Sequence, residues 1–173
     1  MSRSYSAALP IAHVLLRILI VLNWLLGAAI VTLLLVMPNE QWIMASFHLS
    51  PSPDADRLVM GLRAVAVIGV IATPLNYLLL KRLLAIVATV RAGDPFVAAN
   101  AQRLQGIAWV LLALQLIGGV VGAIGKAIST PAHPVHFDAG ASLSGWLAVL
   151  LAFVLARVFA EGARMRDDLE GTV

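Results

Sequence analysis

The amino-acid sequence predicts an all-α integral membrane protein, a four-helix bundle in which every helix crosses the bilayer. Four apolar stretches, at approximately 14–37, 58–80, 106–125 and 139–159, are each long enough to span a hydrocarbon core of about 30 Å as a helix. Of the 173 residues, 61% are hydrophobic and 12% are charged, whereas a soluble domain has about 25% charged residues. We therefore expect a single membrane domain over 1–173.

Lys and Arg residues are distributed unevenly between the two sides that four crossings would create. One side would hold nine of the 12, namely Arg3, Arg17, Lys81, Arg82, Arg91, Arg103, Arg157, Arg164 and Arg166. Cytoplasmic loops of membrane proteins carry such an excess. We therefore predict that both termini and the loop between the second and third helices are cytoplasmic. This placement also explains the net charge of +3, so we expect no direct contact with nucleic acid.

The first helix is predicted at about 14–37, all of it within the membrane. Asn23 is a polar residue near its middle, and Pro38 ends it because proline cannot continue a helix. Small residues at 27–29 are similar to the cleavage site of a signal peptide. The apolar run continues for eight residues beyond them, which is longer than a signal peptide needs. We therefore expect a retained membrane helix.

The second helix is predicted at about 58–92, of which 58–80 cross the membrane. Pro74 is expected to kink this helix near Val70–Ile71, because proline removes a backbone hydrogen bond. Beyond Leu80 the apolar residues keep a helical spacing, and basic residues take the other positions. The helix should therefore project into the cytoplasm by about three turns, roughly 16–18 Å.

The residues Gly93, Asp94 and Pro95 are typical of a tight turn between two antiparallel helices. Gly93 suits the position after a helix, where φ is positive. Asp94 suits the N-cap of the next helix, and Pro95 suits its first position. The third helix is thus predicted at about 95–126, with 106–125 in the membrane. The second and third helices would then form a helical hairpin that extends into the cytoplasm.

The third helix contains a G-x-x-x-G pattern at Gly118 and Gly122, which allows a neighbouring helix to approach closely. We expect that neighbour to belong to the same chain, and we leave the oligomeric state open. The fourth helix is predicted at about 139–168, with 139–159 in the membrane. Opposite charges spaced one turn apart support its cytoplasmic end.

Polar side chains within or near the membrane form a first set of candidate residues: Asn23, Arg63, Asn76 and Gln115. An intramembrane Arg commonly marks a ligand or ion-pair site. Arg63 lies near the outer interface, where its side chain can also extend to water, and the amides can bond across helices. Two interpretations therefore stay open, a polar cavity between the helices or purely structural contacts.

A weak candidate metal site lies in the loop between the third and fourth helices, at His133, His136 and Asp138. Imidazole and carboxylate groups can bind a divalent transition metal. Pro134 works against a helical arrangement of the two histidines, so ordinary loop histidines are the main alternative.

The sequence contains no set of residues typical of an enzyme. It has no Cys, no Asp or Glu in the middle of a predicted span, and no Gly-rich phosphate-binding loop outside the membrane. We therefore expect a non-enzymatic protein without a cofactor.

Two motifs resemble a known family pattern. One is Gly93-Asp94-Pro95-Phe96-x3-Asn100-x2-Arg103-Leu104-x2-Ile107-x-Trp109, and the other is the tail Phe159-x2-Gly162-x2-Met165-Arg166 up to Val173. With the helix count and loop placement, they resemble a bacterial and archaeal family of four-helix membrane proteins known only as a domain of unknown function. The resemblance implies a multi-pass protein of the prokaryotic inner membrane. Members are often encoded beside a small helix-turn-helix regulator, which implies a cytoplasmic protein partner in addition to membrane lipid.

These observations favour a small membrane sensor or anchor that controls a cytoplasmic, transcriptional regulator. The expected partner-binding residues lie in the hairpin and near the end of the fourth helix, namely Arg91, Asp94, Pro95, Phe96, Asn100, Arg103 and Arg166. The alternative is a small transporter, or a membrane protein that binds lipid or another small molecule. In that case Asn23, Arg63 and Gln115 would line an intramembrane cavity.

Overall fold

A computed structural model describes residues 3–36, 53–129 and 142–170. Over these ranges the chain forms helices and no strands: α1 (Arg3–Val36), α3 (Pro53–Arg91), α4 (Ala98–Ile128) and α5 (Leu143–Glu170). Each helix contains a segment that is apolar and long enough to cross a membrane. The prediction of an all-α protein with four membrane-spanning helices is therefore confirmed.

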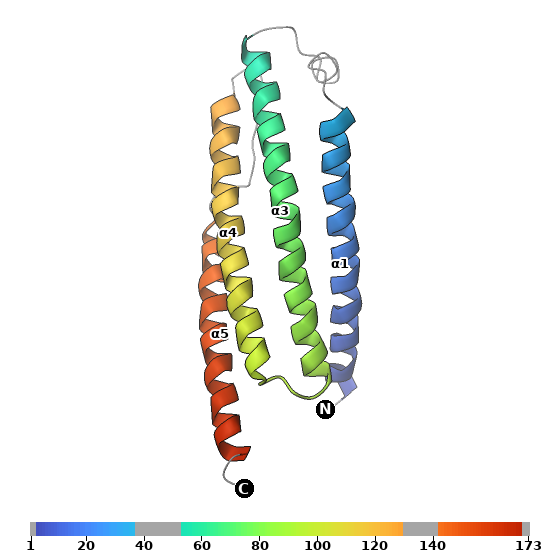
Figure 1. The fold of residues 1–173 in the computed structure, drawn as a ribbon, viewed down its shortest axis with the longest axis vertical. Helices are drawn as coiled ribbons and strands as arrows, with labels where there is room; N and C mark the ends of the chain where they lie inside the picture. Colours follow the sequence, from blue (N-terminus) through green and yellow to red (C-terminus); the bar gives the residue numbers. More distant parts are fainter. Residues whose placement is uncertain (1–2, 37–52, 130–141, 171–173) are drawn as a thin grey trace.

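The helices lie side by side in the order α1, α3, α4, α5 (Figure 1). α1 packs against α3, α3 against α4, and α4 against α5, and no other two of the described helices are in contact. The beginning of α1, the turn between α3 and α4, and the end of α5 lie at the same end of the molecule, which we call the turn end. α4 therefore has a helix on two sides, whereas α1 and α5 each have one helical neighbour.

α3 is too long to be contained in the hydrocarbon core. Its 39 residues rise by about 58 Å, roughly twice the thickness of that core. The helix runs unbroken through Pro74 and beyond Leu80 to Arg91, as the helical spacing of the apolar residues predicts. The excess length places part of the helix in the interfacial region or in water.

The starts of the helices differ from the expected positions. α1 begins at Arg3 rather than near 14, so the helix includes the polar residues that precede the apolar stretch. α3 begins at Pro53, which suits a first helical position because proline has no N–H group to leave unpaired. α5 begins at Leu143 rather than near 139, because Ser142 caps it. The backbone N–H of Gly145 donates to the Ser142 hydroxyl oxygen, with an N–O distance of 3.1 Å.

Small residues bring neighbouring helices close together. Gly27 of α1 faces Thr73 of α3, and a Cβ atom at position 27 would lie 2.6 Å from the Thr73 Cγ2 atom. One turn away, the rings of Trp24 and Tyr77 pack with their centroids 5.4 Å apart. Within the most apolar segment of α1, 6% of the residues are buried inside the protein, so lipid must cover most of that helix. Between helices in lipid, van der Waals packing of this kind drives association.

Candidate functional site at the turn between α3 and α4

The turn begins with a hydrogen-bonded helix end. Gly93 has a φ of +85°, in the left-handed region that glycine adopts without a steric penalty. The N–H of Gly93 donates to the Val90 carbonyl, and the N–H of Asp94 donates to the Thr89 carbonyl, each with an N–O distance of 3.1 Å. This is the Schellman arrangement, which pairs the last carbonyls of a helix. The predicted role of Gly93 is therefore confirmed.

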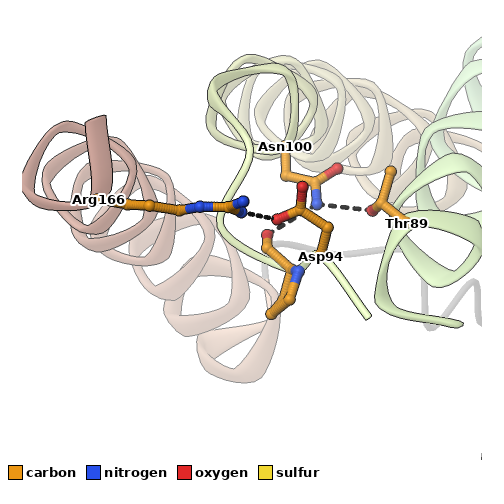
Figure 2. Close-up of polar contacts among 5 residues, drawn as sticks. Thr89, Asp94, Asn100 and Arg166 are labelled. Carbon is orange, nitrogen blue, oxygen red and sulfur yellow. Dashed lines mark hydrogen bonds and ion pairs between the residues drawn. The ribbon is translucent and has the colours of Figure 1, made fainter. Parts of the chain in front are cut away.

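Asn100 is the centre of a polar network that ties the start of α4 to the end of α3. Its side chain is fully buried, at 0% exposure. The amide nitrogen donates to the Thr89 hydroxyl at 2.7 Å, as Figure 2 shows, and to the Pro95 carbonyl at 2.9 Å. The amide oxygen accepts a hydrogen bond from Arg103 at 2.7 Å. Because both ends of the amide have partners, the cost of burying it is offset.

Arg103 completes this network within the hairpin. Besides Asn100, its guanidinium group donates to the carbonyl of Ala85 on α3, with an N–O distance of 3.4 Å. The sequence predicts that Asn100 and Arg103 contact a partner directly. In this structure the Asn100 amide and one guanidinium nitrogen of Arg103 bond inside the hairpin, which helps to hold the turn in shape. Direct contact of these two residues with a partner stays a prediction.

Asp94 does not cap α4 as its sequence position predicts. α4 begins at Ala98, and its N-cap is the extended residue Val97, which makes no side-chain capping bond. The Asp94 carboxylate accepts instead from the guanidinium group of Arg166 on α5 (Figure 2). Both side chains are partly exposed, at 38% for Asp94 and 44% for Arg166. The acidic group therefore joins the turn to the last helix, and the expected N-cap at Asp94 and helix start at Pro95 are wrong.

Phe96 provides a second contact between the turn and α5. Its ring lies 5.3 Å from that of Phe159, centroid to centroid. A Cβ atom at Gly162 would lie 3.0 Å from the Phe96 Cδ1 atom, so the absence of a side chain at Gly162 makes room for the ring. The Phe96 side chain is still 45% exposed. It therefore packs on α5 in part and presents the rest of its surface outward.

Thr89 escaped prediction from sequence, whereas Phe159 and Gly162 belong to the tail motif quoted above but were not predicted to contact the turn. The contact between Thr89 and Asn100 could have been predicted from sequence, because residues that meet in an antiparallel helical hairpin are nearly equidistant from its turn. Thr89 bonds Asn100, and Arg82 lies over Gly106. An antiparallel helical pair requires this spacing. The contacts with α5 have no such signal, since Asp94 and Arg166 are 72 residues apart.

We use the term turn surface for the exposed and half-exposed residues of this region, Arg91, Asp94, Pro95, Phe96 and Arg166. The surface carries two arginines and one carboxylate, so its balance of charge is positive. It is supported from inside by Asn100 and from the side by α5. The surface therefore combines an apolar ring with charged groups of both signs.

Two of the predicted intramembrane polar residues form hydrogen bonds between different pairs of helices. The Asn23 amide donates to the Thr73 carbonyl between α1 and α3, at 3.1 Å. The Gln115 amide donates to the Ser142 carbonyl between α4 and α5, at 3.3 Å. Arg63 and Asn76 are half-buried on α3. Asn23 and Gln115 therefore each form a hydrogen bond across a different pair of helices, and a common cavity for the polar residues stays a prediction.

The predicted metal-site residues His133, His136 and Asp138 lie outside the described residues. Within residues 3–36, 53–129 and 142–170, no group of three or more His, Asp or Glu side chains is placed to hold a metal ion.

Comparison with known proteins identifies a family. No curated protein and no solved structure matches this chain. A family model described as "Protein of unknown function (DUF2975)" matches residues 35–173, a range that contains α3, α4, α5 and the whole turn surface. The chain therefore belongs to the DUF2975 family of proteins of unknown function.

Proposed function

We propose that this protein is a non-enzymatic membrane anchor that binds and controls a cytoplasmic regulatory protein through the turn surface. The observation that carries the proposal is the buried network of Asn100, which fixes the shape of a turn beyond the apolar spans. A preformed surface loses less conformational entropy when it binds a partner.

The charge of the turn surface indicates the kind of partner. Arg91 is exposed, and 44% of the Arg166 side chain is exposed beside Asp94. Phe96 adds an apolar group to the same surface, and aromatic and Arg residues are common at binding hot spots. A protein with an acidic rim around an apolar depression would complement this surface. A helix-turn-helix regulator that presents such a face is the proposed partner.

The proposed orientation places the turn end in the cytoplasm of a prokaryotic cell, with the helices in the inner membrane. The start of α1 and the end of α5 lie at the turn end, and nine of the 12 Lys and Arg residues fall on that side in the four-span topology. The positive-inside rule then assigns this end to the cytoplasm.

Control of the partner is proposed to act through α5. This helix touches the turn through the Asp94–Arg166 ion pair and the Phe96–Phe159 ring contact. A signal that displaced α5 along α4 would separate both contacts and change the turn surface. The free energy of these two contacts is small, because the ion pair is partly exposed, so a modest signal is sufficient.

The experiment is photocrosslinking in native membranes from a photoreactive residue at Ala99. Ala99 is exposed on the first turn of α4 and makes none of the contacts that hold the turn together. The matched control is the same residue at Asp56, which is exposed at the opposite end of α3. We expect a specific soluble protein, identified by mass spectrometry, to be crosslinked from position 99 and not from position 56.

A charge reversal sharpens this experiment. Arg91→Glu places an acidic group on the turn surface, and repulsion of an acidic partner should lower crosslinking from position 99 by at least about tenfold. The variant should insert into the membrane at the wild-type level. Crosslinks from position 99 to lipid or to the chain's own helices alone would show that the hairpin is only structural.

A further inference from the structure

A groove runs between the first turns of α4 and the second half of α5, with a cavity volume of about 410 Å³. Its floor consists of small side chains and its rim carries two cations; these residues are Ala101, Ala156, Ala160, Ala163, Arg157 and Arg164. Small-molecule sites commonly have volumes of about 300–1,000 Å³. The groove is therefore large enough to hold part of a ligand, and it is separate from the turn surface.

The spacing of the alanines on α5 explains why the groove is open. Ala156, Ala160 and Ala163 follow an i, i+4, i+7 pattern, so they share the face of the helix that is turned to α4. Their side chains are too small to fill the space beside Ala101. Phe153 closes the groove toward the middle of the membrane, where its ring meets Trp109 edge to face at 5.3 Å.

The two cations of the rim are differently paired. Arg164 lies 3.7 Å from the Glu161 carboxylate, in an exposed pair that contributes little energy. Arg157 has no acidic partner within 4 Å among the described side chains. The two arginines are seven residues apart, which places them on the same side of α5 with a rise of about 10 Å between them. An anionic group between them would interact with both.

The depth of the groove matches the boundary between lipid tails and headgroups. A core of about 30 Å uses about 20 residues of a helix, so a span that starts at Leu143 leaves the core near position 162. Arg157 then lies just inside this boundary and Arg164 just outside it. Long Arg side chains at such positions extend toward the headgroups.

We propose that this groove binds an anionic glycerophospholipid from the leaflet at the turn end. The lipid phosphate lies between Arg157 and Arg164, and one acyl chain follows the alanine floor toward Phe153. Gln102 and Gln105 on the rim of α4 can donate hydrogen bonds to the ester oxygens. A helix from a second copy would also fit the small residues. Such a helix would bury Arg157 without the counter-charge that a lipid phosphate supplies, and burial of an unpaired charge is unfavourable.

This proposal does not depend on a protein partner, so it is tested with the purified full-length protein. The protein is placed in nanodiscs of phosphatidylcholine that contain a minor fraction of phosphatidylglycerol, and the lipids that stay bound are measured by native mass spectrometry. The test variant is R157Q/R164Q. The matched control is K81Q/R91Q, which removes the same charge from two exposed residues outside the groove. In the proposed complex each guanidinium group makes a charge-assisted hydrogen bond to the lipid phosphate, so R157Q/R164Q should weaken phosphatidylglycerol binding by about 30-fold, and K81Q/R91Q should weaken it far less.

Two further variants separate the groove from general charge effects and from misfolding. Ala160→Leu fills the floor without a change of charge and should also release phosphatidylglycerol. R157K/R164K keeps the charge and should retain it. Soluble glycerol 3-phosphate should not compete, because it lacks the acyl chain that the floor receives.

Wild-type binding of phosphatidylglycerol by R157Q/R164Q would overturn the proposal. An equal loss in K81Q/R91Q would reduce the effect to non-specific attraction and would also overturn it. A disulfide between two copies of Ala160→Cys, with no lipid retained by the wild type, would overturn the proposal and assign the groove to a second copy instead.

Discussion

Replacement of Asn100 by Ala should loosen the turn without unfolding the membrane helices. The change removes two neutral hydrogen bonds, to Thr89 and to the Pro95 carbonyl, and one bond from the charged Arg103. Neutral bonds contribute about 1 kcal/mol each and a bond to a charged group about 2 kcal/mol. Water can enter at this exposed end and replace some of them. We therefore expect the local opening free energy of the turn to fall by about 2–4 kcal/mol.

Hydrogen–deuterium exchange of the protein in nanodiscs measures this effect directly. At about 1.4 kcal/mol per factor of ten, exchange at amides 97–103 should become roughly 30 to 700 times faster. Exchange in the spanning part of α1 should not change, because that helix does not contact α4. Gln105→Ala is the matched control, since it removes an exposed amide from the same helix. If exchange at 97–103 in Asn100→Ala equals that of the control, the buried network does not stabilise the turn.

Three other changes test separate parts of the structure. Gly162→Val places methyl groups against the Phe96 ring and should destabilise the contact of the turn with α5 by about 1–3 kcal/mol, seen as faster exchange at 94–97; unchanged exchange would mean that the ring moves aside freely. Asn23→Ala removes one hydrogen bond between α1 and α3 and should lower stability by only about 0.6 kcal/mol in a steric-trapping assay, whereas a loss of several kcal/mol would point to a further role for this amide. Because the chain has no Cys, single cysteines at Asp56 and Arg91 can be labelled with a membrane-impermeant maleimide; only position 56 should react in intact cells, and the reverse pattern would invert the proposed topology.

The two proposals meet on α5 without sharing residues. Arg157 and Arg164 belong to the groove, while Arg166 and Phe159 contact the turn. A lipid in the groove and a protein on the turn surface would therefore both act on the position of the same helix. If lipid binding shifts α5, phosphatidylglycerol should alter the exchange rates at 94–97, and this linkage is measurable with the nanodiscs described above.

Local sequence is sufficient to predict the fold class and much of the turn. The apolar stretches are long enough to span a membrane without help from any other part of the chain, so the helices follow from local composition. The positive φ of Gly93 follows equally from local sequence, because few other residues adopt that conformation. The bounds of the helices do not follow from local sequence in the same way, because a side chain that could cap a helix can bond to another group instead. Asp94 shows this, because its carboxylate pairs with Arg166 rather than with α4.

The contacts of the polar residues in the turn depend on how the helices pack, which local sequence does not predict. From sequence alone, Asn100 is expected to be an accessible amide in a polar stretch. In the structure it is fully buried, because the end of α3 packs against the start of α4 and Thr89 bonds its side chain. The same is true of the α5 contacts and of the groove, which combine residues from helices that are distant in the chain. Local sequence sets the conformation of each helix through short-range sterics and the transfer of apolar groups into lipid. The packing of whole helices determines which side chains are in contact, and a single stretch of sequence does not predict this packing.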